Sequence, residues 1–357
     1  MQRIELGWFI PTQGDTTAYG DPKADIPASL AMFDRVTQAA EQAGFEYLLI
    51  PVNQHCWEAW ITGAMMAARS KTIKPLIAAR PGYINPVLLA KMVSTFDQLS
   101  GGRICINLIA GLSDEQSAGD GLRYTKEDRY ALMDEEVTIL KKLWTATGPI
   151  DFDGKFYQLR NASVTPRIYQ KPYPKFYLGG GSREAWEVSA KHSDVHLFWG
   201  DHPDRVAQQM QEIRGIAARY GRDKDIGFGM RLQIICRPTE QQAWDAARTL
   251  VASAGQQHVE RVSKLYGNSA ANQRQKELGA TDLIMPHLWT GITKVRAGAG
   301  VAVVGNPQQC ADTLQKFIDV GCHSFCLSGY PHDEEAEIFG RAVLPLLQAR
   351  NKQRMAA

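Results

Sequence analysis

The sequence predicts an α/β protein that folds as a (β/α)8 TIM barrel, and three observations favour this fold. Short apolar runs alternate with segments of helical periodicity along most of the 357 residues, which is typical of a parallel sheet wrapped by helices. Eight such pairs occur, with no obvious linker between them. The chain is 44% hydrophobic and can bury one large core. Eight units favour a closed barrel over an open sheet, so we expect residues 1–357 to form a single domain.

The strands are expected where short apolar runs are bounded by polar or glycine-bearing residues. In chain order they are residues 6–10, 47–50, 73–78, 104–109, 176–178, 195–199, 228–236 and 324–327. Helices are expected between them, each near a start signal such as Asn85-Pro86 or Asn306-Pro307. They are residues 29–43, 58–68, 87–99, 129–144, 183–192, 204–220, 240–251 and 307–320.

Three stretches interrupt this repeat and are expected as insertions, chiefly after strands 4 and 7. Residues 111–128 are polar and glycine-bearing and follow the fourth strand. Residues 149–174 carry a hairpin signal with Asp153-Gly154 at the turn. Residues 253–300 are long and weakly patterned, and a loop of that length is usually functional or disordered. Because loops after strands form the catalytic face of a barrel, we expect all three to lie on that face or to border it.

Charge and composition exclude several classes of partner. The chain has 40 basic and 38 acidic residues, a formal charge of +2, so neither nucleic acid nor an acidic membrane surface is expected. The first residues enter a strand-like run at once and no apolar run reaches membrane-spanning length. Six scattered cysteines are read as reduced thiols, so we expect a cytoplasmic location. No metal site is expected, because His192 and His196 are separated by the end of a helix.

The strongest site signal is a cation within a run of small residues. Arg296 opens the run Arg296-Ala297-Gly298-Ala299-Gly300, and the last strand ends at Ser328-Gly329-Tyr330-Pro331-His332. A mobile guanidinium beside a fixed polar rim suits the capture of a small anion that is then sealed from water. Arg231 and Gln233 alternate within the seventh strand and therefore point the same way. An inward arginine needs an anionic partner, whereas an outward one would pair with a helix carboxylate.

A second signal is Gly179-Gly180-Gly181-Ser182, which follows the fifth strand and opens a helix. Converging backbone N–H groups and a helix N-terminus make a phosphate cradle, although a flexible turn has the same sequence. Asn107, Tyr130 and Trp199 lie at or near strand ends on the same face. Trp199 could wall an aromatic ligand or plug the barrel mouth. Cys56 follows the second strand and could face the site.

At these residues the chain resembles a known family, the bacterial luciferase-like flavin-dependent monooxygenases, in their alkanesulfonate monooxygenase branch. The matching stretches span nearly the whole chain in order. They include Trp8-Phe9-Ile10-Pro11-Thr12-Gln13-Gly14-Asp15, Asp97-Gln98-Leu99-Ser100-Gly101-Gly102-Arg103, Phe176-Tyr177-Leu178-Gly179-Gly180, Leu288-Trp289-Thr290-Gly291, the Arg296 run and Leu327-Ser328-Gly329-Tyr330-Pro331-His332.

The resemblance implies a two-component enzyme. Reduced flavin mononucleotide (FMNH2) is the co-substrate and comes from a separate NAD(P)H-dependent flavin reductase. With O2 it oxidises an organosulfonate, cleaving the carbon–sulfur bond to give a carbonyl product and sulfite. Residues 253–300 become a mobile lid that excludes water. By analogy with barrels of this type we also expect a homo-oligomer, a dimer or a tetramer.

The resemblance also implies roles for individual residues. The catalytic set around the sulfonate and the reacting flavin edge is Arg296, Tyr330, Arg231 and Cys56, with Tyr330, helped by Arg296, in proton transfer. The substrate-binding set is Trp199, Gln233, Gln13, His332 and His55. The flavin-binding set is Asn107, Tyr130, Gly179, Gly180, Gly181, Ser182 and Ala79.

Three positions depart from the family pattern. Gln13 stands where members acting on simple alkanesulfonates carry a histidine, and Gln233 replaces another histidine on the seventh strand. The loop before Cys56 is Val52-Asn53-Gln54-His55 instead of the usual Thr-Gly-Arg-Ser. Because amides both donate and accept hydrogen bonds, they suit hydroxyl groups better than an alkyl chain. A sugar sulfonate such as sulfoquinovose, or another organosulfur compound, is therefore an alternative substrate.

Two other functional classes fit the same barrel. One is a non-catalytic flavin-binding protein, against which Arg231, Arg296 and Tyr330 argue. The other is a deazaflavin-dependent dehydrogenase, which uses no oxygen. A Schiff-base aldolase is disfavoured because no lysine lies centrally in a predicted strand.

Overall fold

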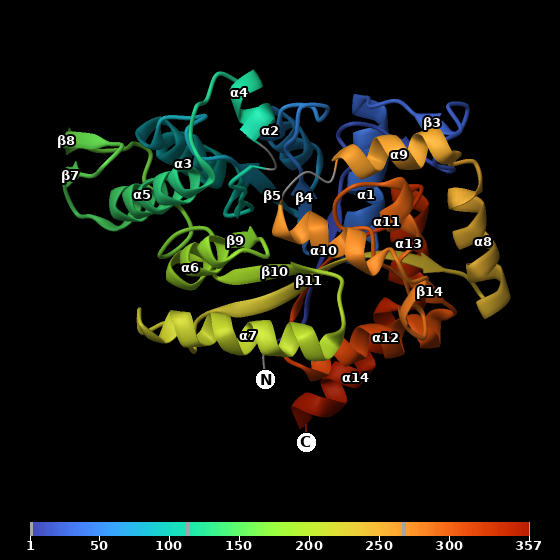
Figure 1. The fold of residues 1–357 in the computed structure, drawn as a ribbon. Coiled ribbons are helices and arrows are strands. Elements are labelled where there is room, and N and C mark those ends of the chain that lie inside the picture. The colour runs from blue at the N-terminus through green and yellow to red at the C-terminus, as the bar shows by residue number, and fades with distance from the viewer. Residues whose placement is uncertain (1–2, 112–113, 266–268, 357) are drawn as a thin grey trace.

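The computed structural model describes residues 3–111, 114–265 and 269–356, and eight parallel strands form a closed barrel (Figure 1). The β11 strand closes the ring by pairing with β10 and β15. Every predicted barrel strand is present within one residue of its expected bounds, so the predicted fold class is confirmed. The strands are β1 (Glu5–Phe9), β4 (Tyr47–Ile50), β5 (Lys74–Ala79), β6 (Cys105–Leu108), β9 (Phe176–Gly179), β10 (Val195–Trp199), β11 (Gly227–Cys236) and β15 (Ser324–Ser328).

The predicted helices also form, and their start signals act as caps. The Asn85 side chain accepts from the backbone N–H of Val87, with Pro86 as the first helical residue. Asn306 and Gln309 form a reciprocal capping box. The eight helices that alternate with the barrel strands are α1 (Leu30–Gln42), α2 (Ala59–Arg69), α3 (Pro86–Ser100), α5 (Lys126–Thr145), α6 (Arg183–His192), α7 (Pro203–Ala218), α8 (Glu240–Ala252) and α12 (Pro307–Asp319).

Two C-terminal helices were not among the expected elements. They are α13 (His332–Ala342) and α14 (Leu344–Ala356), and α13 packs beside α1. The polar run after the last strand was read as a rim of the site, whereas in the structure His332 is already the first residue of α13. This placement fixes the rim rigidly, because it is the start of a helix that packs on the barrel.

The hairpin insertion forms as predicted but stays at the border of the catalytic face. Strands β7 (Ile150–Asp153) and β8 (Gln158–Ala162) pair antiparallel and project from the barrel (Figure 1). The turn is held by Glu135 of α5, whose carboxylate accepts from the backbone N–H of Lys155 at 2.6 Å. The fourth-strand insertion contains α4 (Asp114–Gly119). A further hairpin follows the first strand, made by β2 (Asp15–Thr16) and β3 (Asp25–Ile26).

The weakly patterned region 253–300 contains more regular structure than its sequence suggested. Its elements are α9 (Gln256–Leu265), α10 (Ala270–Leu278), β12 (Leu283–Met285), β13 (Leu288–Trp289) and α11 (Gly291–Val295). A later strand, β14 (Ala302–Gly305), pairs with the second half of β11, which runs on past the barrel. The two helices are polar in composition, and α10 owes its place to tertiary contacts described below.

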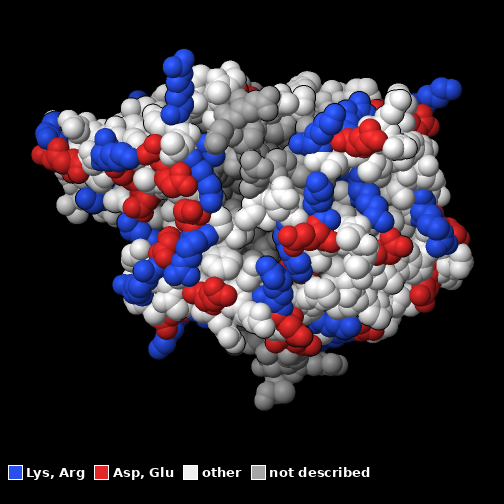
Figure 2. Space-filling model, in the orientation of Figure 1, with Lys and Arg blue, Asp and Glu red and all other residues white. Residues whose placement is uncertain are grey.

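Charged side chains of both signs are mixed on the face of the molecule shown in Figure 2, in keeping with the nearly balanced composition. Among the described residues, no helix combines the length and the apolar character needed to cross a membrane. All six cysteines are free thiols.

Candidate active site

A large cleft of about 1890 Å³ opens at the carboxyl ends of the barrel strands. All eight strands, or the loops that follow them, contribute lining residues, and α9 and α10 cover part of it. Ligands of parallel barrels bind at this face because the loops there vary without disturbing the core. The cleft is therefore the candidate active site.

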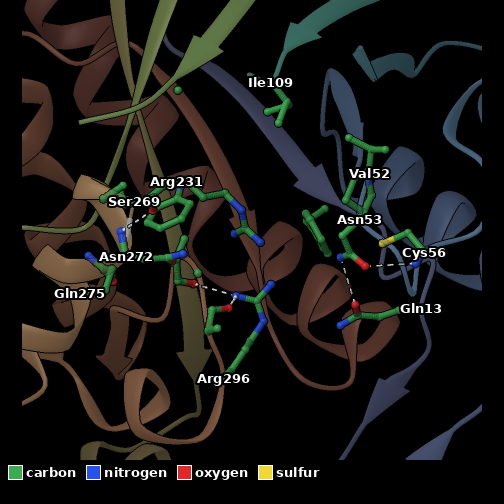
Figure 3. Close-up of a pocket in the computed structure, with 18 of the residues that line it drawn as sticks. Gln13, Val52, Asn53, Cys56, Ile109, Arg231, Ser269, Asn272, Gln275 and Arg296 are labelled. Carbon is green, nitrogen blue, oxygen red and sulfur yellow. Dashed lines mark hydrogen bonds between the residues drawn. The ribbon is translucent and has the colours of Figure 1, made fainter. Parts of the chain in front are cut away.

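Two arginines from distant parts of the chain converge on one aromatic ring in this cleft. The guanidinium carbon of Arg231 lies 4.6 Å from the centroid of the Phe9 ring, and that of Arg296 lies 6.0 Å from the same centroid. Figure 3 shows the two guanidinium groups pointing toward each other. Two positive charges held beside one ring repel each other, and an anion bound between them would offset this repulsion. The structure thus brings together the two arginines that the sequence singled out.

Arg231 is held rigidly and keeps one open donor. Its side chain is buried, and Nη1 donates to the hydroxyl of Ser328 at 2.9 Å and to the carbonyl of Leu232 at 3.0 Å. Nη2 is buried and has no hydrogen-bond partner among the described residues. Burial lowers the pKa of Arg231, and the charge of Arg296 acts in the same direction. A bound anion would satisfy the open donor and offset both effects.

Gln233 lies on the same side of β11 as Arg231, as the alternation predicted, but it does not line the cleft. Its amide oxygen accepts from Ser328 at 2.5 Å and its nitrogen donates to the carbonyl of Ala299 at 2.8 Å. The side chain is fully buried. With both amide atoms engaged within the protein, Gln233 contacts Arg231 indirectly, through Ser328.

The lid region is pinned to the barrel next to the arginine pair. Gln275 of α10 donates to the carbonyl of Gly200 at 2.9 Å and accepts from the backbone N–H of Gly300 at 3.3 Å. Arg274 makes two bonds to the Asp201 carboxylate, at 2.7 and 2.8 Å. These contacts join α10, the end of β10 and the run that begins at Arg296, so the arginine sits in a covered position.

The opposite wall of the cleft is polar and includes Cys56 (Figure 3). Asn53 organises it, because its amide nitrogen donates to Gln13 at 3.3 Å while its oxygen accepts from the backbone N–H groups of His55 and Cys56. Burial raises the pKa of the Cys56 thiol above its ordinary value. Cys56 is therefore a protonated thiol at neutral pH, a weak hydrogen-bond donor and not a thiolate nucleophile.

Tyr330, His332 and Trp199 line the cleft as the resemblance implied. Lining residues that were not among the predicted site residues include Phe9, Asp15 and Tyr19. Phe9 ends the first strand and Asp15 follows it, and a carboxylate at the carboxyl end of a barrel strand was an available signal. Tyr19, whose ring lies 5.2 Å from that of Tyr330, gave no signal, since it reaches the site only through the β2–β3 hairpin.

Comparison with known proteins identifies the fold family. Residues 4–324 match the family described as luciferase-like monooxygenases. The chain belongs to this family. As a luciferase-like monooxygenase it is a flavin-dependent enzyme.

Several solved structures share this fold. DmoA from Hyphomicrobium sulfonivorans shares 18% identity, covers 98% of this chain and 89% of its own, and has a TM-score of 0.81. Riboflavin lyase (RcaE), solved with modified FMN and riboflavin, shares 19% identity with coverage of 98% and 92% and a TM-score of 0.79. EDTA monooxygenase (EmoA) from Chelativorans sp. BNC1 shares 18% with coverage of 98% and 94% and a TM-score of 0.76. At these identities the likeness concerns the fold alone.

In this luciferase-like monooxygenase the glycine turn after β9 has the geometry of a phosphate cradle. The turn 179–182 lines the cleft and ends at Ser182, which caps α6 by accepting from the N–H of Ala185. Gly180 has a φ of 156°, and a Cβ there would lie 2.7 Å from the Ala185 methyl. The turn therefore requires glycine at this position, and it aims the helix N-terminus at the cleft.

The neighbouring residues fit a flavin phosphate and ring. Tyr130 and Asn107 line the same cleft, and burial raises the pKa of Tyr130, which keeps its hydroxyl neutral. Asn272 of α10 adds a buried side-chain oxygen that has no hydrogen-bond partner among the described residues. Ala79, expected beside the flavin, packs in the main apolar core, and its neighbour Ala78 lines the cleft instead. Among the described residues, no group of three or more His, Cys, Asp or Glu side chains could hold a metal ion.

Proposed function

We propose that the protein is an FMNH2- and O2-dependent organosulfonate monooxygenase that cleaves the carbon–sulfur bond to release a carbonyl product and sulfite. The observation that supports this proposal is the pair Arg231 and Arg296 over Phe9, with the buried Nη2 of Arg231 unpartnered within the described chain. Such a site is complementary to a compact, permanently charged oxyanion.

A sulfonate meets this requirement better than a carboxylate or a neutral alkane. It stays ionised at any physiological pH and has three oxygens, so several donors can bind it at once. In a site closed to water, fixed cationic donors stabilise it far more than in solution. A neutral alkane would leave the two arginine charges uncompensated and would lose their binding energy.

Reduced flavin, when bound, supplies the electrons that activate O2. The chain itself would hold the flavin phosphate at the turn 179–182 and at the start of α6, with Tyr130 and Asn107 beside it. The α10 helix covers this region, and a Cβ on Gly181 would lie 3.4 Å from the backbone nitrogen of Ala271. A lid that rests on the cradle keeps water out and has to move for a dissociable flavin to enter. The flavin would come from a separate NAD(P)H-dependent reductase.

The polar wall favours a substrate with hydroxyl groups. Gln13, Asn53 and His55 lie at the exposed part of the cleft and present amide and imidazole groups toward it. An alkyl chain there would desolvate these groups without replacing their hydrogen bonds with water. A sugar sulfonate such as sulfoquinovose is therefore the preferred substrate, ahead of a long alkanesulfonate.

A substrate panel tests the proposed activity. We expect sulfite release with FMN, a generic flavin reductase, NADH and air, and a kcat/KM for sulfoquinovose above that for octanesulfonate. Carboxylates of matched chain length are the control and should give no product. Absence of sulfite from every sulfonate would contradict the proposal. Absence of oxygen uptake would favour a non-catalytic flavin-binding protein, and anaerobic reduction of a deazaflavin would favour a dehydrogenase.

The arginine site is tested by Arg231→Met, which keeps an unbranched side chain but removes the guanidinium and its charge. Loss of a buried charge-assisted contact to the substrate should lower kcat/KM by about 10²-fold or more. The matched control is Arg214→Met, because Arg214 also lies over an aromatic ring, 5.0 Å from the Phe228 centroid, but outside the cleft. That variant should stay within about twofold of the wild type, the range expected for exposed contacts. Equal effects of the two substitutions would argue against an anion site at Arg231.

The phosphate cradle is tested by Gly180→Ala. The new methyl would collide with Ala185 and the φ of 156° would be strained, so the turn should open and FMN affinity should fall by at least about tenfold. Quenching of flavin fluorescence on titration measures this affinity. Gly215→Ala, with no atom within 4 Å of the added methyl, is the control. Unchanged FMN affinity in Gly180→Ala would place the phosphate elsewhere.

A homo-oligomer is supported by an exposed apolar stripe on the outside of the barrel. Ile61 and Met65 lie four residues apart on α2 and are 70% and 42% exposed, and Trp57, four residues before Ile61 and just ahead of the helix, is 51% exposed. Leu88 of the neighbouring α3 is 54% exposed. Exposed apolar residues that gather on neighbouring helices are typical of protein–protein interfaces. We propose that a second copy of the chain covers it.

Substitution in the stripe tests the assembly. Ile61→Glu should shift the mass from an oligomer toward the 39.6 kDa monomer, because a buried unpaired charge opposes association. Size-exclusion chromatography with light scattering measures the mass. Leu99→Glu, at an isolated residue that is 86% exposed, should leave the oligomer intact. A monomeric wild type would rule out the proposed interface.

A further inference from the structure

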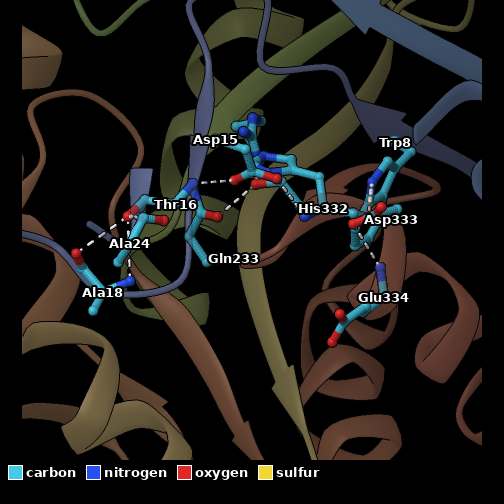
Figure 4. A network of polar contacts seen from close by, with 11 residues as sticks. Trp8, Asp15, Thr16, Ala18, Ala24, Gln233, His332, Asp333 and Glu334 are labelled. Atoms are coloured by element: carbon cyan, nitrogen blue, oxygen red, sulfur yellow. Dashed lines mark hydrogen bonds and ion pairs between the residues drawn. The ribbon is translucent and has the colours of Figure 1, made fainter. Parts of the chain in front are cut away.

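A buried carboxylate–imidazole pair lies in the wall of the cleft. Asp15 follows the first strand and His332 is the first residue of α13, and the imidazole Nδ1 lies 2.8 Å from one carboxylate oxygen (Figure 4). The other oxygen accepts from the backbone N–H of His332 at 2.7 Å. Both side chains are almost completely excluded from solvent, at 2% and 1% exposure.

The second imidazole nitrogen is open. A carboxylate can only accept hydrogen bonds, so Nδ1 carries the proton and Nε2 of the neutral ring presents a lone pair. Nε2 is buried and has no hydrogen-bond partner among the described residues, while His332 lines the cleft. Capping of α13 needs only the Asp15 carboxylate and a backbone N–H. It does not explain an imidazole whose remaining nitrogen has no protein partner.

The open nitrogen belongs to a ring beside the anion site. The centroid of the His332 ring lies 5.8 Å from that of Phe9, the same ring over which Arg231 and Arg296 meet. Tyr330 packs edge-on against the imidazole at 4.8 Å. The other neighbours on the packed elements are Asp15 and Trp8, whose indole N–H binds the backbone carbonyl of His332 and leaves the imidazole unaffected.

This inference rests on the proposed function. The balanced reaction releases a proton from the sulfur-bearing carbon of the substrate, and this proton needs an acceptor. A sulfonate R–CH2–SO3⁻, O2 and the two hydrogens of reduced flavin give R–CHO, SO3²⁻, water and one proton. One hydrogen of the sulfur-bearing carbon leaves as that proton, and its electron pair forms the new carbon–oxygen bond. The carbon–sulfur pair departs with sulfite as the carbonyl forms, and the second oxygen atom ends in water.

We propose that Nε2 of His332 accepts the proton from the sulfur-bearing carbon, and that Asp15 is a positioning residue that fixes the imidazole tautomer and ring orientation. The arginines hold the sulfonate oxygens, so the carbon one bond from sulfur falls beside the Phe9 floor that His332 borders. Tyr330 is then left to donate a proton to a departing oxygen. His332 therefore accepts one proton and Tyr330 donates the other, so each proton transfer has its own group.

The decisive variant is His332→Gln, compared with His332 wild type on ordinary and on C1-dideuterated sulfonate. Loss of a general base should lower kcat by roughly 10²–10⁴-fold, with a much smaller change in KM. The primary isotope effect on kcat should rise, because removal of the carbon-bound proton becomes rate-limiting. His202→Gln, at an exposed histidine outside the cleft, should change neither quantity. Tyr330→Phe should lower kcat without raising the isotope effect.

The role of Asp15 has its own readouts. In Asp15→Asn the imidazole loses the carboxylate that fixes its tautomer and ring orientation, so kcat should fall with little change in KM. Nitrogen NMR on histidine-labelled protein without flavin should show a lone-pair Nε2 for His332, identified by its absence in His332→Gln. That signal should shift when a sulfonate is added. If Asp15→Asn does not fold because the cap of α13 is lost, the kinetics of His332→Gln and the NMR signal of the wild type test the proposal instead.

Retention of kcat within threefold in His332→Gln with an unchanged isotope effect would overturn the inference. So would a protonated Nε2 in the neutral ring. A wild type that releases no sulfite from any sulfonate would mean that the proposed function fails. In that case the NMR signal alone tests the pair, and a protonated Nε2 again overturns it.

Discussion

The cleft is organised around the positive charges of Arg231 and Arg296, which lie over the same Phe9 ring in a partly buried, low-dielectric environment. Arg231 is held by a hydrogen bond to Ser328, which in turn binds Gln233. Arg296 lines the cleft at the start of a run of small residues. Such an arrangement costs free energy in the empty protein and repays it only when an anion binds between the charges. Electrostatic strain of this kind is expected where a protein selects a small oxyanion.

The barrel makes this arrangement possible because its strands hold the floor of the site rigidly, while separate helices cover it. Phe9 and Arg231 belong to strands whose neighbours on both sides are hydrogen-bonded, so the floor of the site cannot shift easily. The cover is made of short polar helices held by a few side-chain bonds, such as Arg274 to Asp201 and Gln275 to Gly200. Few side-chain bonds hold the cover, which suits the opening that the proposed function requires of it.

The other polar groups of the cleft lie in two regions, an exposed wall around Asn53 and a buried wall that holds Asp15 and His332. Asn53 organises the open wall, where a hydroxylated substrate would exchange hydrogen bonds with water-exposed amides. Asp15 and His332 occupy the buried wall, where solvent has no access and an open lone pair can meet only a substrate atom. The same cleft therefore combines a solvent-exposed polar region, which the proposed function assigns to substrate recognition, with a buried polar region, which it assigns to bond cleavage.

The sequence alone determined the barrel, because eight strands and their helices follow from local periodicity, and it marked both arginines and the glycine turn by composition. Tertiary structure decided what each side chain does. Arg231 and Gln233 share one face by strand alternation, yet β11 continues past the barrel to β14, and this buries Gln233 against Ala299. The positions of Phe9, Asp15 and Tyr19 in the site depend on contacts more than 200 residues apart, such as the 317-residue separation between Asp15 and His332. Local patterns carry no record of such long-range pairings, because they arise only when the closed barrel brings the two ends of the chain side by side.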